Sequence, residues 1–457
     1  MAAPSSGTAG RSADVAIIGL GSAGEALAGR LRDAGRSVVG FEPGLVGGEC
    51  PFTACMPSKA LLHQAHRPGA RSADAWRLAI DHRDRVANHR DDAEHATDLV
   101  ERGLVLVRER AALAGPRQVV ADGTIWTVDH VIIATGSAPS LPPIPGLDQI
   151  DYWTSEDALT SSERPERIVI VGAGPIGCEL GDVYRSFGSR VTLLEAGDRL
   201  LPDHDAEVAE HYASAIGTAG LELRLSADVV SVARIAGTAS ATIHLRDGTM
   251  LTADRVLIAA GQSPRLGDVG LDALGLSTDE VPELDESFAV SGHPWLRLIG
   301  DLNGRSPWTH GANVEAAIVA ASILGGPAPM ADPVMPHAVF TDPPAAHVGR
   351  SVDAHEAEGR QTIRGVGRVD DIARHATDRL DRGMAVLTID AETGVVVGGS
   401  IVGPLADELI AIVTAWVHLE ATIEQAASQV FAFPTIAQIL EVAAADARTQ
   451  WRASHPA

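Results

Sequence analysis

Near the start of the chain, two short apolar runs flank a glycine-rich turn and an amphipathic segment. The first run spans 14–18, the turn carries Gly19, Gly21 and Gly24, and the second run, 37–41, ends at Glu42. This order predicts a strand over 14–18, a helix over 25–34 and a strand over 37–41. Together they form a β-α-β unit.

The same pattern returns further along the chain. A run over 168–171 precedes Gly172, Gly174 and Gly177, and a second run, 190–194, ends at Glu195 with the same spacing from the first glycine. In such a unit the glycines allow a tight turn, approach to a pyrophosphate and close helix packing, and the acid binds ribose hydroxyls. Two copies predict two dinucleotide sites. Glu195 would repel a 2'-phosphate and so favours NADH, although the nearby Arg199 weakens that preference.

Three further patterns organise the rest of the chain. Apolar strands over 131–133 and 256–258 end in small residues and are interpreted as crossovers between domains. A strand over 298–301 ends at Asp301, whose carboxylate suits a polyol hydroxyl, and a helix is predicted over 310–324. Strands over 385–389 and 395–401, followed by Ala-rich helices after 405, predict a separate C-terminal domain.

Composition narrows the class of protein. The 457 residues are too many for one core, and 45% hydrophobic with 21% charged residues is ordinary for a globular protein. No apolar run approaches the ~20 residues of a membrane span. A formal charge of -24 argues against nucleic acid as partner. Residues 1–12 lack the apolar segment of a secretory signal, so we expect a disordered tail and a cytoplasmic protein.

Cys50 and Cys55, with four residues between them, are followed closely by Lys59, which is the only lysine in the chain. A close cysteine pair in a reducing compartment is typically catalytic or metal-binding. Zinc is disfavoured because no second Cys or His pair completes a tetrahedral set, so we expect no metal. A compact ammonium in a chain that otherwise uses arginine indicates a chemical role for Lys59.

With these cysteines, both glycine motifs, Ala134-Thr135-Gly136, Gly300-Asp301 and Phe340-Thr341-Asp342-Pro343 in order, the chain resembles the class I pyridine nucleotide-disulfide oxidoreductases, of the dihydrolipoamide dehydrogenase type. The resemblance implies an α/β fold with two Rossmann-like domains, for FAD and NAD(P)H, and an α+β dimerisation domain that completes the active site of the partner in a homodimer. The implied boundaries are 1–12 for the tail, 13–147 and 265–332 for the FAD-binding domain, 148–264 for the NAD(P)-binding domain and 333–457 for the dimerisation domain.

The resemblance also implies roles for individual residues. Cys50 would be the outer, interchange thiol, Cys55 the thiol beside the flavin, and Lys59 a cation at the flavin ring paired with Glu179. Cys178 is interpreted as buried packing. The implied cofactor contacts are Gly19, Gly21, Gly24, Glu42, Gly48, Lys59, Thr135, Gly136, Ser137, Asp301, Gly172, Gly174, Gly177, Glu195 and Gly261.

The C-terminal segment departs from the family pattern. Where the family carries His-Pro-Thr, with a Glu five residues after the His, this chain has Phe433 and Gln438. General acid-base assistance is typically worth about 10² to 10⁴ in rate, and an imidazolium would favour the Cys50 thiolate. Efficient reduction of lipoamide or glutathione disulfide is therefore not expected, unless another group such as His63 or His66 supplies the proton.

The sequence thus predicts an FAD-dependent NAD(P)H oxidoreductase that reduces an unidentified, non-standard small-molecule acceptor through Cys50 and Cys55. Three alternatives stay open. Quinones or dyes could be reduced at the flavin, as in a diaphorase, or the protein could be a flavin redox sensor. 2-Ketopropyl-coenzyme M oxidoreductase/carboxylase, a superfamily member that carries Phe at the His position and Cys-Pro-x-x-Ala-Cys, offers C-S bond cleavage in a proton-poor pocket. The paired C-terminal cysteines of mercuric reductase are absent.

Overall fold

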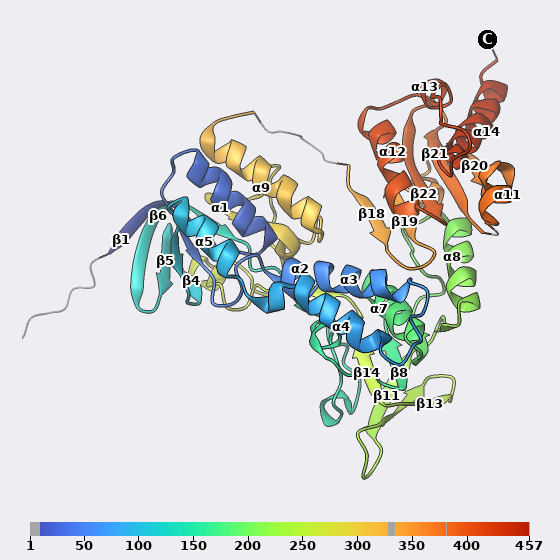
Figure 1. Ribbon diagram of the computed structural model, residues 1–457. Helices are drawn as coiled ribbons and strands as arrows, with labels where there is room; N and C mark the ends of the chain where they lie inside the picture. Colours follow the sequence, from blue (N-terminus) through green and yellow to red (C-terminus); the bar gives the residue numbers. More distant parts are fainter. Residues whose placement is uncertain (1–9, 328–333, 381, 457) are drawn as a thin grey trace, which may run out of the picture. The chain divides into compact units, whose positions relative to one another are not determined.

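A computed structural model of the 457-residue chain describes residues 10–327, 334–380 and 382–456. It divides into two compact units (Figure 1). The first contains 1–57, 81–140 and 262–333, and the second contains 58–80, 141–261 and 334–457. The domain boundaries expected from the sequence stay a prediction. No helix in the described parts of the chain is long and apolar enough to cross a membrane.

The first unit is built on an eight-stranded sheet whose central strands are parallel. Its main order is β16 (Ala289–Val290), β17 (His293–Leu298), β6 (Thr124–Ile133), β1 (Arg11–Ile18), β2 (Val38–Phe41) and β3 (Val105–Val107), while β4 (Ala111–Gly115) pairs with β5 (Gln118–Ala121), which pairs with β6. Alternate residues of β1 enter two cores, because Val15 and Ile17 pack with α1 (Ser22–Asp33) and α9 (Thr309–Leu324) while Ala16 and Ile18 pack on the opposite face. Helices α4 (Ala75–Val86) and α5 (Ala93–Glu101) lie in the segment that leads to β3.

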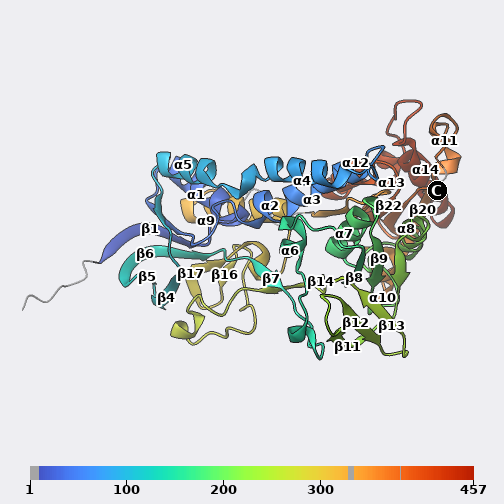
Figure 2. The ribbon, with the colours of Figure 1, turned by 60° about the horizontal axis from the view of Figure 1, so that its bottom comes forward.

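The second unit contains a four-stranded parallel sheet in the order β10 (Glu222–Arg224), β9 (Arg190–Leu194), β8 (Arg167–Val171) and β14 (Arg255–Ile258). An antiparallel sheet of β11 (Val229–Arg234), β12 (Ala241–Leu245) and β13 (Met250–Ala253) lies beside it (Figure 2). Helices α7 (Pro175–Ser186) and α8 (Ala206–Thr218) follow β8 and β9. Their apolar faces share one core with the parallel sheet.

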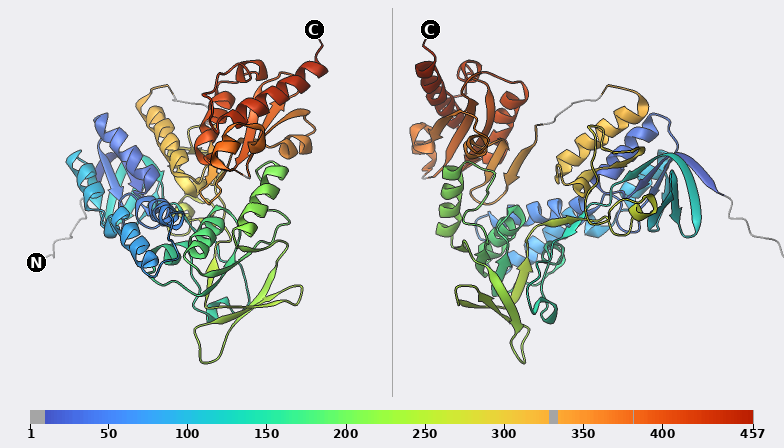
Figure 3. Two further views of the ribbon diagram at one scale, coloured as in Figure 1. Left: turned by 45° about the vertical axis from the view of Figure 1, so that its right-hand side comes forward. Right: turned by 180° about the vertical axis from the view of Figure 1, so that it is seen from behind.

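The C-terminal part of the second unit is a five-stranded antiparallel sheet. The order is β18 (Pro336–Val339), β19 (Ala345–Gly349), β22 (Val396–Val402), β21 (Met384–Asp390) and β20 (Thr362–Arg368). Helices α12 (Ala406–His418) and α14 (Gln438–Ser454) cover one face of this sheet (Figure 3). Successive residues of β21 alternate between the core under these helices and the core of α7 and α8. The predicted mixed α/β class is confirmed.

Two local expectations are wrong. The predicted tail over 1–12 is too long, because Arg11 and Ser12 already pair with Trp126 and Thr127 as the start of β1; residues 1–9 lie outside the described part of the chain. The predicted strand over 298–301 is misplaced, because the observed strand lies earlier in the chain, over His293–Leu298. Strand β17 ends at Leu298, and Gly300–Asn303 forms a 3-10 turn because Gly300 adopts a φ of 74°.

Three histidines form a cluster with tilted rings where the C-terminal sheet meets the loop before α8. The ring of His347 lies 4.5 Å from that of His204 and 4.6 Å from that of His337, measured between centroids. His204 and His347 are only 4% and 7% exposed. Burial, and then the neighbouring His337, lower the pKa of His347 to about 4, against an opposing effect of Asp203. Burial and the other two histidines also hold the pKa of His204 well below its ordinary value.

This cluster predicts acid sensitivity of the fold. A folded-state pKa below that of the unfolded chain means that the stabilisation is complete above about pH 6.5 and is lost progressively down to about pH 4. The free energy of unfolding in a denaturant titration should therefore fall by roughly 2 kcal/mol from this group between pH 7.5 and pH 5. The variant His347→Gln should show a smaller pH dependence, and His418→Gln, at an exposed position, should keep that of the wild type. Equal slopes in the two variants would contradict the account.

Candidate functional site

Both glycine motifs form the predicted turns between a strand and a helix. Gly19, between β1 and α1, has a φ of 94°, and Gly172, between β8 and α7, has a φ of 103°. A Cβ at Gly19 would lie 2.4 Å from the carbonyl oxygen of Ala134, and one at Gly172 would lie 2.3 Å from that of Ala259. Only glycine fits these two positions, because both the backbone angle and the space exclude a side chain.

The third glycine of each motif allows the helix to pack against its own turn. A Cβ at Gly24 or at Gly177 would lie 2.0 Å from the carbonyl oxygen of the first glycine of its motif. The middle glycine differs, because around Gly174 no atom lies within 4 Å of an added Cβ. Open space in front of a helix N-terminus is what a pyrophosphate needs, so the turn fits a dinucleotide.

Glu42 and Glu195 occupy equivalent places at the ends of β2 and β9. Glu42 accepts hydrogen bonds from the amides of Leu20 (2.9 Å) and Gly44 (2.8 Å). Glu195 accepts the matching pair from Ala173 (2.9 Å) and Gly197 (2.8 Å). Each carboxylate therefore lies next to its glycine turn, where the ribose of a bound dinucleotide would lie.

Several other predicted cofactor residues gather in the first unit. Asp301 lies in the turn after β17, where burial and the nearby Glu49 raise its pKa above the ordinary value, against a hydrogen bond from Ser137. Ser137 is the first residue of β7 (Ser137–Pro139), and Thr135 Oγ1 donates to the carbonyl of Arg265 at 3.0 Å. Gly136 precedes β7 with a φ of 70°.

The two remaining predicted glycines have positive φ angles. Gly48, with a φ of 72°, precedes α2 (Glu49–Phe52) and lies against Gly21, whose Cα would be 2.7 Å from an added Cβ. Gly261, with a φ of 112°, follows β14 and is the last residue of its segment in the second unit. The first therefore belongs to the N-terminal glycine turn, while the second stands near the end of the parallel sheet.

Cys50 lies in α2, and Cys55 is the first residue of α3 (Cys55–Ala65). Thr309, the first residue of α9, lies against both thiol groups. Its hydroxyl donates to Cys50 Sγ at 3.1 Å and is 3.6 Å from Cys55 Sγ. A hydrogen bond to a thiolate stabilises the charged form, so Thr309 can favour the reactive state of Cys50. This contact was not predicted from the sequence, in which Thr309 only precedes the helix expected over 310–324.

Lys59 and Glu179 form the ion pair that the resemblance implied. Lys59 Nζ lies 2.7 Å from Glu179 Oε2, and the carboxylate side chain is 7% exposed. The second oxygen of Glu179 accepts the amide of Phe340 at 3.2 Å. The ring of Phe340 lies 4.7 Å from the ammonium, so the cation contacts both a carboxylate and an aromatic face. Sequence reasoning used Phe340 as part of a motif and did not predict this contact.

Cys178 is fully buried, as expected for packing, and its thiol donates to the carbonyl of Ala173 at 3.2 Å. Burial raises its pKa to about 12, so it stays a thiol at neutral pH. His66 follows α3 and bonds Asp182 with its Nε2 at 2.7 Å. Arg199 binds Asp353 Oδ2 at 2.8 Å and the carbonyl of Pro202 at 2.7 Å, so its guanidinium is already engaged.

Phe433 lies in the segment before α14, and Gln438 is the first residue of that helix. The ring of Phe433 is 75% exposed, and Val430 nearby is 92% exposed. Gln438 accepts the amide of Thr435 at 3.3 Å and donates to Glu441 at 3.3 Å. The segment therefore offers an apolar ring and a primary amide where the family pattern has an imidazole and a carboxylate.

Comparison with known proteins assigns the chain to a family. Residues 13–321 match the pyridine nucleotide-disulphide oxidoreductase family, and residues 335–444 match the dimerisation domain of the same family. The chain belongs to this family.

Individual relatives agree with this assignment. Dihydrolipoyl dehydrogenase 3 from Pseudomonas putida is 31% identical over 459 residues, which cover 95% of this chain and 98% of the relative. Mercuric reductase from Streptomyces lividans is 31% identical over 457 residues, covering 94% and 95%. The solved structure of the HOCl-induced flavoprotein disulfide reductase RclA from Escherichia coli has a TM-score of 0.85 and 25% identity, covering 94% of this chain and 99% of that one.

The family assignment confirms the predicted class of enzyme, an FAD-dependent pyridine nucleotide-disulfide oxidoreductase that uses FAD and NAD(P)H. The match to the dimerisation domain supports a homodimer. The acceptor and the roles of single residues are not decided by these comparisons. The individual residue roles stay predictions.

The Thr309 contact predicts a test of thiol reactivity. In Thr309→Val the hydroxyl is replaced by a methyl group of similar size, so the Cys50 thiolate loses a hydrogen bond. Because hydrogen bonds to charged groups contribute about 1.5 kcal/mol or more, alkylation of Cys50 by iodoacetamide in the reduced holoenzyme at pH 7 should slow roughly tenfold. Thr309→Ser, which keeps the hydroxyl, should alkylate at nearly the wild-type rate. A valine variant as reactive as the serine variant would show that the hydroxyl does not activate the thiol.

Proposed function

We propose that the protein oxidises NADH and delivers the two electrons to a Cys50–Cys55 disulfide, which then reduces a small-molecule acceptor that is not a standard dithiol-disulfide substrate. Bound FAD would supply the group that accepts hydride from NADH and passes the two electrons on. The disulfide takes up two electrons and, with two protons, becomes a pair of thiols. The observation that carries the proposal is the contact of one hydroxyl, that of Thr309, with both sulfur atoms.

The Lys59–Glu179 pair supports the flavin side of this proposal. An ammonium held by a nearly buried carboxylate has a fixed position, and a preorganised cation stabilises negative charge that develops during reduction. Glu179 makes a second bond to the Phe340 amide, so both of its oxygens are occupied. The carboxylate therefore orients Lys59.

The choice of NADH over NADPH follows from the second glycine motif. Glu195 presents a carboxylate where a 2'-phosphate would lie, and the two charges repel each other. Arg199 could have offset this repulsion, but Asp353 and Pro202 already bind its guanidinium. The contacts of Arg199 therefore strengthen the preference for NADH that the sequence suggested.

The non-standard acceptor follows from Phe433. In the homodimer that the dimerisation domain supports, the resemblance implies that this segment completes the active site of the partner. Phenylalanine brings no proton there, and Gln438 does not titrate in the physiological range. The thiols would then exchange with acceptors that need no proton from the enzyme. A C-S bond cleaved in such an apolar pocket is the second candidate, because Phe433 would shield a carbanion from water.

Restoring the two titratable groups tests the assignment of Phe433. The double variant Phe433→His, Gln438→Glu should raise the rate of lipoamide or glutathione-disulfide reduction by about 10², measured as NADH oxidation at saturating disulfide. Reduction of a quinone or dye should stay unchanged, since that reaction bypasses the thiols. Val430→His is the matched control, because it adds an imidazole at another exposed apolar position of the same segment. No gain in the double variant, or an equal gain in Val430→His, would show that the pocket and not the proton carrier sets the acceptor.

A further inference from the structure

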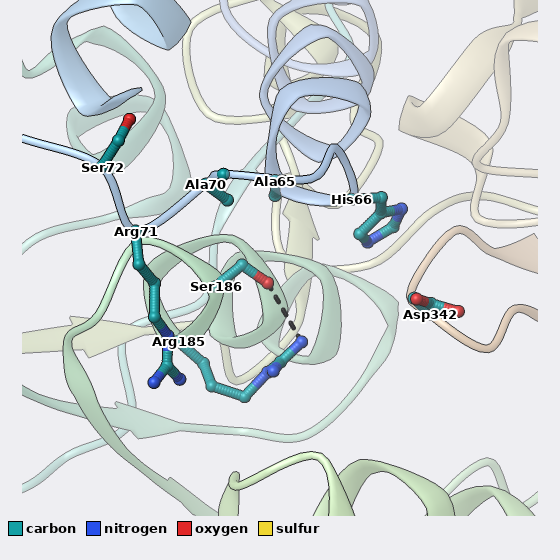
Figure 4. Close-up of a pocket in the computed structure, with 9 residues that line it drawn as sticks. Ala65, His66, Ala70, Arg71, Ser72, Arg185, Ser186 and Asp342 are labelled. Atoms are coloured by element: carbon teal, nitrogen blue, oxygen red, sulfur yellow. Dashed lines mark hydrogen bonds between the residues drawn. The ribbon is translucent and has the colours of Figure 1, made fainter. Parts of the chain in front are cut away.

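A cavity of about 390 Å³ lies at the C-terminal ends of α3 and α7, within the second unit (Figure 4). None of its lining residues has a role in the redox chemistry proposed above. Its polar lining residues are His66, Arg71, Ser72, Arg185, Ser186 and Asp342.

The wall of this cavity is held by Asp182, which is 2% exposed. His66 Nε2 lies 2.7 Å from Asp182 Oδ2, and the backbone amide of Asp342 donates to the same oxygen at 3.1 Å. Arg185 binds the other oxygen through Nε at 3.2 Å and through Nη2. Burial acts to raise the pKa of Asp182, but the hydrogen bonds from His66 and Arg185 outweigh it, so the pKa lies below its ordinary value.

The arrangement repeats that of Glu179, one turn earlier on α7. Glu179 binds the α3 residue Lys59 and the amide of Phe340, and Asp182 binds His66, just after α3, and the amide of Asp342. Two successive carboxylates of one helix thus hold the same two neighbouring segments. The side chain of His66 and the backbone at Asp342 are therefore held before any ligand arrives, which lowers the entropic cost of binding.

Charge is divided across the cavity. Figure 4 shows Arg71, Arg185 and Ser186 on one side and His66 and Asp342 on the other. Arg185 is committed to Asp182, to Ser186 Oγ at 3.0 Å and to the carbonyl of Ala219 at 2.9 Å. Arg71 is exposed, and within the described parts of the chain no carboxylate forms an ion pair with its guanidinium. A planar guanidinium binds carboxylates through two parallel hydrogen bonds.

We propose that this cavity binds a small organic carboxylate, with the carboxylate group against Arg71 and the hydroxyl of Ser186 as a further donor. The Asp342 carboxylate on the opposite side disfavours a polyanion there. Two kinds of ligand remain, a monocarboxylate or a zwitterion whose ammonium faces Asp342. This site goes beyond the proposed redox function and does not depend on it.

The test measures binding, not turnover. Propionate and alanine, a monocarboxylate and a zwitterion of similar size, are titrated by calorimetry into the FAD-loaded protein at constant ionic strength. Saturating NAD⁺ is present so that the second glycine turn is occupied. We expect saturable binding of at least one probe and a loss of affinity of about tenfold or more in Arg71→Gln. Arg67→Gln is the control, because Arg67 is an exposed arginine of the same loop outside the lining; its affinity should equal that of the wild type.

If neither probe binds the wild type saturably up to about 100 mM, a concentration that corresponds to a very weak affinity, the proposal is overturned. Equal affinities in Arg71→Gln and Arg67→Gln would overturn it as well, because the anion would then bind elsewhere. The variant Asp342→Asn distinguishes the two kinds of ligand. Removing this carboxylate should tighten the binding of propionate by relieving repulsion, and should weaken the binding of alanine by removing the partner of its ammonium.

Discussion

The arrangement of the second unit around α3 depends on the contacts of the Glu179 carboxylate. It lies at the start of α7, almost buried, and binds both the only lysine of the chain and the amide of Phe340. A nearly buried carboxylate is tolerated only when its oxygens are satisfied by such partners. Because Lys59 lies one turn after Cys55 on α3, the same contact fixes the helix that begins with a redox thiol. These polar contacts thus connect Lys59, the helix α3 that begins with Cys55, and Phe340, which follows β18.

Local patterns were predictable and long-range contacts were not. The glycine turns and the strands around them follow from residues close in sequence, since only glycine permits the angles at Gly19 and Gly172. The contact of Lys59 with Glu179 was expected only through the family resemblance. Thr309 is more than 250 positions from Cys50, and no periodicity links them. The histidine cluster could not be predicted either, because its members come from a loop and two strands that meet only in the folded chain.

The chemistry that these residues allow is thiol chemistry with little acid-base assistance. Thr309 offers a hydrogen bond but cannot change charge, and Phe433 offers neither. His66 is bound to Asp182, and Glu179 is bound to Lys59. An enzyme of this kind can hold a reactive thiolate, yet it depends on its acceptor for protons. Under the proposed function, this constraint rather than the shape of a pocket would set the acceptor.

Anaerobic titration of the FAD-loaded protein with NADH, followed by absorbance, tests the central claim most directly. If Cys50 and Cys55 accept the electrons, a long-wavelength charge-transfer band between the Cys55 thiolate and oxidised flavin should grow in with one equivalent of NADH. It should be absent from Cys55→Ser. Bleaching of the flavin without this band in the wild-type protein would contradict the account, because the electrons would then stay on the flavin and the cysteine pair would be bypassed.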